Sequence, residues 1–179
     1  MYKVCIIGND GAGKSTLAKL IQTTVLTDAE VCSFASTLKA DLASINVPVH
    51  KKPYSASIRN FVRSYGDLMR ELYGPGYWAD KLISSLNDTS HSIVVDDMRY
   101  WSELEAWTTH FGKSTKVITV GAIQPYKDDY ARSVIEVNEL LTVLRKDATS
   151  NTLHLPDIKT TPQEITVDLL KNYLISNNK

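Results

Sequence analysis

Residues 8–15 read Gly8-Asn9-Asp10-Gly11-Ala12-Gly13-Lys14-Ser15, a complete G-x-x-x-x-G-K-[ST] phosphate-binding loop. An apolar run, Val4 to Ile7, leads into this motif, and a helix-prone run, Thr16 to Ile21, follows it. The motif needs a strand before it and a helix N-terminus after it, and the sequence supplies both. The alternative is an ordinary glycine-rich turn between a strand and a helix. The two flanks favour a site for a nucleoside triphosphate.

Each part of the motif has its own expected role. The glycines let successive backbone N–H groups turn toward phosphate oxygens, and the helix N-terminus adds partial positive charge. We expect Lys14, in a solvated loop, to reach the β- and γ-phosphates of ATP, and the Ser15 hydroxyl to bind Mg²⁺. The expected nucleotide-binding residues are Gly8, Asp10, Gly11, Ala12, Gly13, Lys14, Ser15 and Thr16.

Length and charge narrow the kinds of partner. The 179 residues are expected to form a single domain, 1–179. Twenty basic and twenty acidic residues balance, so no overall field attracts nucleic acid or an anionic membrane. Cys5 and Cys32 lack metal-binding spacing, which predicts buried free thiols in a reducing compartment. The first apolar run ends too early for a signal peptide or a membrane span, so we expect a cytoplasmic protein.

Short β-prone runs alternate with helical patterns along the chain. The β-prone runs are 2–7, 30–33, 92–96, 116–120 and 152–155, and the expected helices are 13–23, 36–44, 55–73, 77–86, 102–111, 129–144 and 162–175. This alternation predicts an α/β fold with a parallel sheet covered on both faces. Ligands of such sheets bind at the carboxyl ends of the strands, where the phosphate loop also lies.

A second nucleotide element follows the third β-prone run, which ends in Asp96 and Asp97. An aspartate at the end of a strand beside a phosphate loop commonly helps to hold Mg²⁺. The expected metal ligands are therefore Ser15 with Asp97 or Asp96, and the sequence does not decide between the two acids. The alternative is that Asp97 only caps the turn into the helix beginning near Ser102.

The long helix expected over 55–73 has two distinct faces. Its apolar positions follow helical periodicity and are Ile58, Phe61, Val62, Tyr65, Leu68, Met69 and Leu72. Arg59, Arg63 and Arg70 fall within roughly 40° of one another on a different face, with Gly66 leaving a gap in their row. Arginine suits bidentate phosphate recognition, whereas the alternative is a solvated charged face. We prefer Arg59 and Arg63, because Arg70 is closer to the helix end.

Several segments together resemble one family. Residues 34–39 are similar to its F-A-x-x-L-K, Arg59 to Gly66 followed by Tyr77-Trp78-Ala79 resemble its R-x-x-x-Q-x-x-G block and Y-W element, and Asp97-Met98-Arg99 with Glu103 is similar to its D-x-R-x-x-x-E. The family is the phage-type deoxynucleoside monophosphate kinases, and the resemblance covers roughly residues 2 to 121. It implies a P-loop kinase three-layer sandwich with a five-stranded parallel sheet. It also implies transfer of the γ-phosphoryl group of ATP to a deoxynucleoside monophosphate (dNMP), in the host cytoplasm if the protein is phage-encoded.

The resemblance also assigns regions and residues. Substrate-binding helices fall at about 36–87 and a lid at about 122–138, where Arg132 and Lys127 are candidate closing cations. The family's glutamine is Arg63 here, and Ser15 stands where many members have aspartate. The candidate catalytic residues are Lys14, Arg59, Arg99 and Arg132, and the candidate substrate residues are Lys39, Arg59, Arg63, Arg70, Trp78, Arg99 and Trp101. Trp78 and Trp101 would stack on a base, and the alternative is that both belong to the core.

The expected chemistry needs no general base, because the second pKa of a phosphate monoester lies near ~6 and the acceptor oxygen is already ionised. The partners are then small-molecule nucleotides with ATP and Mg²⁺, without nucleic acid or membrane, and a homodimer is left open. A phosphomevalonate-kinase-like enzyme would use the same residues on another phosphate. A small-alcohol kinase would require a dedicated base, and a slow NTPase switch would leave the arginine row without a purpose.

Overall fold

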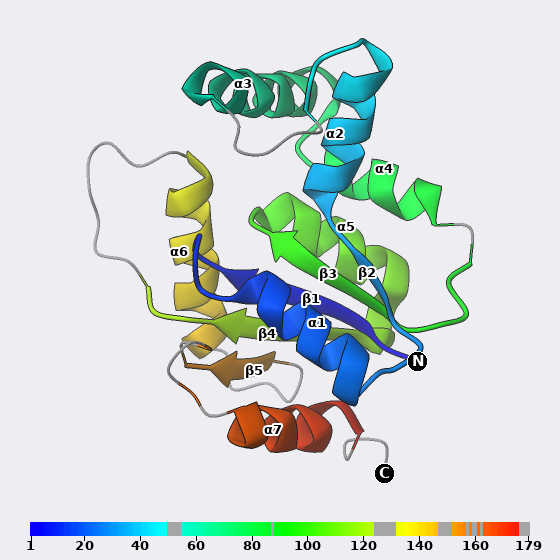
Figure 1. The fold of residues 1–179 in the computed structure, drawn as a ribbon, viewed down its shortest axis with the longest axis vertical. Helices are drawn as coiled ribbons and strands as arrows, with labels where there is room; N and C mark the ends of the chain where they lie inside the picture. Colours follow the sequence, from blue (N-terminus) through cyan, green and yellow to red (C-terminus); the bar gives the residue numbers. More distant parts are fainter. Residues whose placement is uncertain are drawn as a thin grey trace.

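The computed structural model describes residues 1–49, 55–86, 88–123, 132–146, 152–156, 158, 161 and 163–175, except for the side chains at 132 and 133. Its strands form one sheet in the order β2-β3-β1-β4-β5 (Figure 1). The strands are β1 (Lys3–Gly8), β2 (Glu30–Cys32), β3 (Ile93–Met98), β4 (Thr115–Val120) and β5 (Thr152–Leu155). All neighbouring pairs are parallel, which confirms the expected five-stranded parallel sheet.

Helices cover both faces of this sheet. They are α1 (Lys14–Thr24), α2 (Phe34–Ser44), α3 (Ala56–Tyr73), α4 (Tyr77–Ser85), α5 (Trp101–Phe111), α6 (Arg132–Lys146) and α7 (Gln163–Ile175), with a short 3₁₀ helix η1 (Gly112–Ser114). Alternate residues of β1 point to opposite sides: Val4 and Ile6 pack with α1 and α7, and Cys5 and Ile7 pack with α2, α4, α5 and α6. Because side chains alternate along a strand, a strand covered on both faces is apolar throughout.

The central position of β1 decides where the phosphate loop lies. β1 is flanked by β3 and β4 and is buried along its whole length, so the loop after Gly8 leaves from the middle of the carboxyl edge of the sheet. Helices α2, α3 and α4 lie above the sheet in the view of Figure 1. The phosphate loop and the acidic end of β3 therefore lie at the same edge of the sheet.

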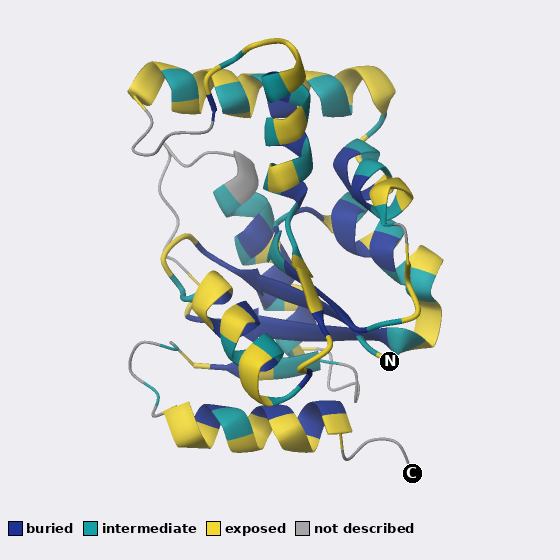
Figure 2. Cartoon of the chain, turned by 45° about the vertical axis from the view of Figure 1, so that its right-hand side comes forward, coloured by how far each residue is buried: buried dark blue, intermediate teal, exposed yellow. Residues whose placement is uncertain are grey.

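Helix α3 uses only part of its apolar surface for packing. Ile58, Val62, Tyr65 and Met69 pack against the core, whereas Phe61, Leu68 and Leu72, expected on the same face, are 47%, 48% and 63% exposed. The helix lies on the outside of the group of helices and shows much exposed surface (Figure 2). The neighbouring helices cover a narrower stripe than the periodicity indicated. Within the described ranges, no helix is both long and apolar enough to cross a membrane.

Candidate active site

The phosphate loop has a backbone that requires glycine. Gly11 and Gly13 have φ of 80° and 89°, in the left-handed region that L side chains rarely adopt. A Cβ added to Gly8 would lie 2.6 Å from the backbone oxygen of Val120 on the neighbouring strand. Gly13 is also the N-cap of α1 and has no side chain to bond the first N–H groups, so these groups remain open to an anionic ligand.

Lys14 differs from the expectation of a solvated side chain. It is buried, and its Nζ donates to the backbone oxygens of Gly8 at 2.8 Å and Asn9 at 2.9 Å. Burial lowers the pKa of Lys14, and the nearby Arg99 guanidinium lowers it further, whereas Asp10 opposes the shift. The lysine therefore folds back on its own loop and holds it in shape, while Ser15 and Thr16 at the start of α1 are exposed.

Asn9 ties the phosphate loop to α6, a contact that sequence reasoning missed. Its Nδ2 donates to Oδ1 of Asn138 at 2.9 Å and to the backbone oxygen of Ala122 at 3.4 Å. Asn9 is an unspecified position of the motif, so no sequence pattern marks it. The expected lid, at about 122–138, begins at this same Ala122. Residues 124–131, with Lys127, and the side chain of Arg132 lie outside the described residues. The backbone of α6 starts at Arg132.

The two carboxylates at the end of β3 have different surroundings. Asp97 accepts from the backbone N–H groups of Phe34 at 2.8 Å and Ala35 at 2.9 Å, so each of its oxygens is bonded to the start of α2. Burial raises the pKa of Asp97, and these two hydrogen bonds oppose the rise. Asp97 thus caps α2, not the turn before Ser102. Asp96 and Asp97 are both half-buried, and the pairing of β3 with β1 shifts register at these two residues.

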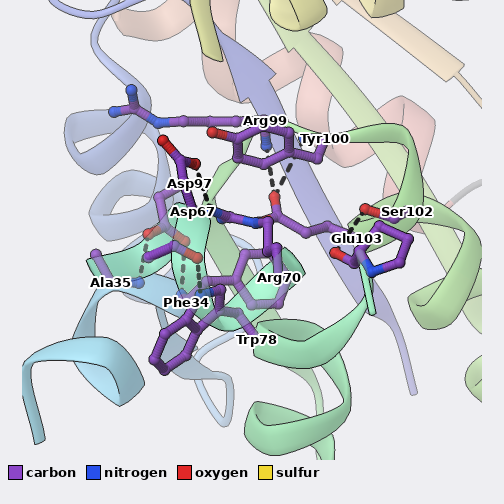
Figure 3. Close-up of polar contacts among 12 residues, drawn as sticks. Phe34, Ala35, Asp67, Arg70, Trp78, Asp97, Arg99, Tyr100, Ser102 and Glu103 are labelled. Carbon is purple, nitrogen blue, oxygen red and sulfur yellow. Dashed lines mark hydrogen bonds and ion pairs between the residues drawn. The ribbon is translucent and has the colours of Figure 1, made fainter. Parts of the chain in front are cut away.

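A cavity of about 290 Å³ opens beside the phosphate loop. Its lining comes from α2, α3, the N-terminus of α4, the end of β3 and the start of α5, and Figure 3 shows residues from each of these elements. The phosphate loop contributes Asp10. The lining residues are Asp10, Phe34, Ala35, Leu38, Arg59, Val62, Arg63, Gly66, Asp67, Arg70, Trp78, Asp97, Arg99, Tyr100 and Glu103. This wall combines four arginines and four carboxylates with apolar surface, and two of the arginines, Arg70 and Arg99, form ion pairs with Glu103 and Asp10. Arginines on such a wall can bind a small anionic ligand.

The three arginines of α3 all line the cavity, but in different states. Arg59 and Arg63, the two preferred from sequence, are exposed at its rim. Arg70 has a side chain only 13% exposed, and its Nη2 lies 3.0 Å from Oε1 of Glu103. Its guanidinium carbon also lies 4.0 Å from the centre of the Tyr100 ring. Arg70 is therefore the arginine whose position the protein fixes most firmly.

Arg99 connects the phosphate loop with the cavity. Its Nη2 lies 2.6 Å from Oδ1 of Asp10, and its backbone N–H donates to Oε2 of Glu103 at 2.9 Å. Burial raises the pKa of Glu103 to about 7, and Arg70 and the N–H of Arg99 oppose that rise. Asp10 of the expected nucleotide site and Arg99 of the expected acceptor site are thus in direct contact.

Neither of the two expected stacking aromatics presents an open ring to this cavity. Trp78 reaches the cavity wall but is 1% exposed, and its Nε1 donates to the backbone oxygen of Gly66 at 3.1 Å. Trp101 is 39% exposed and is not among the lining residues of the cavity, and neither is Lys39. The aromatic that sequence reasoning passed over is Tyr100, which lines the cavity beneath Arg70.

Oxygen donors beside the phosphate loop fit a magnesium ion. Mg²⁺ prefers one or two protein oxygens together with substrate phosphates. The exposed Ser15 hydroxyl and the half-buried Asp96 carboxylate supply such oxygens, whereas both oxygens of Asp97 already accept hydrogen bonds. Among the residues that the structure describes, no group of three or more His, Cys, Asp or Glu side chains is arranged to hold a metal ion without a phosphate ligand.

The sheet order, the phosphate loop and the helices above its edge define the class: this chain has the P-loop kinase fold. It is similar to a gluconokinase from Sinorhizobium meliloti 1021, with a TM-score of 0.53 and 10% identity over 98% of this chain and 92% of that chain. A sugar kinase from Janibacter sp. HTCC2649 is less similar, with a TM-score of 0.44 and 14% identity over 97% and 94% of the two chains. No family model and no curated protein matches the sequence.

Proposed function

We propose that the protein transfers the γ-phosphoryl group of ATP to a dNMP, giving the diphosphate and ADP. The observation that carries the proposal is the convergence of Arg59, Arg63, Arg70 and Arg99 on one cavity that also includes Asp10 of the phosphate loop. A phosphate acceptor needs positive charge opposite the phosphate loop, because two highly charged groups must approach one another. The arginines of this cavity would supply that charge, Arg59 and Arg63 from its exposed rim and Arg70 and Arg99 from ion pairs with Glu103 and Asp10.

In this mechanism the protein positions the two substrates and neutralises the charge of their phosphates, and it moves no proton. Lys14 and the open N–H groups at the start of α1 would bind the donor phosphates, and Arg99 with the arginines of α3 would bind the acceptor phosphate. Ser15 and Asp96 would hold Mg²⁺, which neutralises phosphate charge when bound. Each oxygen of Asp97 accepts one backbone hydrogen bond, which holds this carboxylate against α2. An acceptor phosphate that is already ionised needs no base, whereas an alcohol would need one from Asp96 or Asp97.

A second candidate is a smaller phosphorylated acceptor, such as phosphomevalonate. The observation in its favour is the burial of Trp78, which leaves the cavity without the open indole face expected for a base. The same arginines would bind its phosphate, so the assignment of charge in the mechanism is unchanged. The two candidates differ in what fills the apolar part of the cavity beside Leu38 and Val62.

A coupled assay for ADP tests the proposal. The purified protein is given ATP and Mg²⁺ with each dNMP, each ribonucleotide, phosphomevalonate, gluconate or no acceptor, and Lys14→Ala serves as the control for contaminating kinases. We expect at least one dNMP to be phosphorylated faster than every non-nucleotide acceptor. Turnover of phosphomevalonate or gluconate with no dNMP would overturn the proposal. ADP release that no acceptor stimulates would indicate an NTPase switch instead.

A further inference from the structure

Glu103 is a buried carboxylate that contacts two separate parts of the cavity wall. Its side chain is 2% exposed and lies in the first turn of α5. Oε2 accepts from the backbone N–H groups of Arg99 at 2.9 Å and Tyr100 at 3.2 Å, while Oε1 lies 3.0 Å from Nη2 of Arg70 (Figure 3). One side chain thus joins α3 to the turn between β3 and α5.

Capping of α5 does not by itself explain this residue. Helix α3 is capped by a serine hydroxyl, since Ser55 accepts from the backbone N–H of Ile58. A serine cap stabilises a helix N-terminus by about 1 kcal/mol without burying a charge. A buried carboxylate has a large desolvation cost, and replacing a buried ion pair by apolar residues is often neutral or stabilising. A carboxylate at this place is therefore costly for stability alone.

The burial becomes understandable from what Glu103 does to Arg70. Without a fixed anion, an arginine at a cavity wall would sample many rotamers, as a long side chain does in solvent. Here Arg70 is held between Glu103, the ring of Tyr100 at 4.0 Å and Asp67 at 3.4 Å. Its Nε is buried and has no hydrogen-bond partner among the described residues. Arg70 is thus held in place with one donor unused.

Glu103 acts on Arg99 through the main chain. The hydrogen bonds from the N–H groups of Arg99 and Tyr100 fix the direction in which the chain leaves β3. The Arg99 side chain then extends to Asp10 in the phosphate loop. The same carboxylate therefore determines the placement of two arginines that come from elements far apart in the sequence.

We propose that Glu103 is a positioning residue, which orients Arg70 and Arg99 toward the acceptor and so sets the affinity for the acceptor's anionic group. The inference rests on the proposed function for the identity of the acceptor. Preorganised charge binds better than mobile charge, because the ordering cost is already met in the free protein. The effect should fall more on the acceptor than on ATP, since Glu103 contacts Arg70 directly on the acceptor wall, whereas it reaches the phosphate loop through Arg99 and Asp10.

Steady-state kinetics of Glu103→Gln test the inference, with Glu103→Asp as the conservative variant. Glu105→Gln is the matched control, because Glu105 is an exposed carboxylate on the same helix and does not line this cavity. We expect Glu103→Gln to raise the KM for the acceptor about tenfold and to leave the KM for ATP within about twofold. Glu103→Asp should recover part of the acceptor affinity, and Glu105→Gln should change neither constant.

A double-mutant cycle with Arg70→Met distinguishes an effect of Glu103 on the position of Arg70 from a general destabilisation of the fold. If Glu103 works through Arg70, the two substitutions together should raise the acceptor KM by much less than the product of their separate effects. Binding of a non-hydrolysable ATP analogue and the melting temperature report whether each variant is folded. If Glu103→Gln does not fold, Glu103→Asp takes its place in the cycle.

The possible outcomes are distinct. If the wild type phosphorylates a dNMP, but Glu103→Gln changes both KM values equally or matches Glu105→Gln, the proposed function stands and the positioning inference is overturned. Multiplicative effects in the double-mutant cycle would overturn it as well. If the wild type phosphorylates phosphomevalonate and no dNMP, the proposed function fails, and the same variants test the positioning inference through the KM for phosphomevalonate. If it phosphorylates no acceptor, both are overturned.

Discussion

The two halves of the candidate site are built in different ways. In the phosphate loop, Lys14 bonds to residues five and six positions earlier in the chain. Around the acceptor cavity, Arg70 pairs with a residue 33 positions away, Asp97 with one 63 positions away, and Arg99 with one 89 positions away. The first half depends largely on local backbone geometry, with Asn9 adding a contact to α6, whereas the second forms only when several elements pack together.

This difference has consequences for substitutions. A change at Lys14 removes a proposed contact to ATP, and the position of Lys14 is set by backbone oxygens five and six residues earlier. A change around the cavity disturbs contacts that also hold helices in place, so stability and acceptor binding are linked there. The four predictions below separate these two kinds of effect.

Lys14→Ala should have the largest effect, and it should affect only the phosphate-loop half of the site, which is proposed to bind ATP. Removing a phosphate-binding charge costs about 4 kcal/mol of transition-state stabilisation, so kcat should fall about a thousandfold. The melting temperature should fall by only a few degrees, because the oxygens of Gly8 and Asn9 lose one donor. Kinetics and thermal unfolding are compared with Lys19→Ala, an exposed lysine of α1. Near-normal activity of Lys14→Ala would contradict the assignment of the phosphate loop.

Asp97→Asn should chiefly destabilise the protein. An amide group can accept only at its oxygen, so one of the N–H groups of Phe34 and Ala35 would lose its acceptor at the buried start of α2. We expect a loss of about 2 kcal/mol in the free energy of unfolding, measured with urea. Asp96→Asn should leave stability nearly unchanged and raise the Mg²⁺ concentration needed for half-maximal rate. Equal loss of stability in the two variants would show that Asp97 has no special part in holding α2.

Arg99→Ala should weaken acceptor binding more than donor binding. Its side chain is 32% exposed and pairs with Asp10 across the site, so its loss should leave the core intact. We expect the acceptor KM to rise about tenfold or more, with a smaller change in the KM for ATP. Asp10→Asn removes the partner but keeps Arg99, and should not raise the acceptor KM. A change confined to the KM for ATP would assign Arg99 to the donor half.

Gly66→Ala should have the smallest effect. An added Cβ would lie 2.9 Å from Cδ1 of Leu38, the end of a flexible side chain that lines the cavity. Leu38 can move, and alanine favours a helix over glycine by about 1 kcal/mol, so stability should change by less than about 1 kcal/mol. The displaced Leu38 should narrow the cavity and raise the acceptor KM severalfold. An unchanged KM with unchanged stability would show that this part of the cavity does not contact the acceptor.

Particular residues show how far the sequence could be interpreted. The phosphate loop, the five strands and the row of arginines on α3 follow from local patterns, and the structure has all of them. The sequence favoured Arg59 and Arg63 over Arg70 within that row. In the structure, Arg70 is the arginine held by Glu103 and Tyr100. Its proximity to the end of α3 carried no information about a partner on α5. Spacing did hold a signal for Glu103, which stands three residues after the N-cap Tyr100 as in a capping box.

By itself, then, the sequence determined the phosphate loop and the alternation of strands and helices, because glycine conformations, periodicity and helix starts depend on neighbours along the chain. Tertiary structure alone decided that Asp97 bonds to α2, that Trp78 is buried, that Phe61 faces outward and that Glu103 meets Arg70. Those outcomes depend on which distant segments pack side by side. Burial and pairing of a polar side chain are properties of that packing, and no local pattern specifies them.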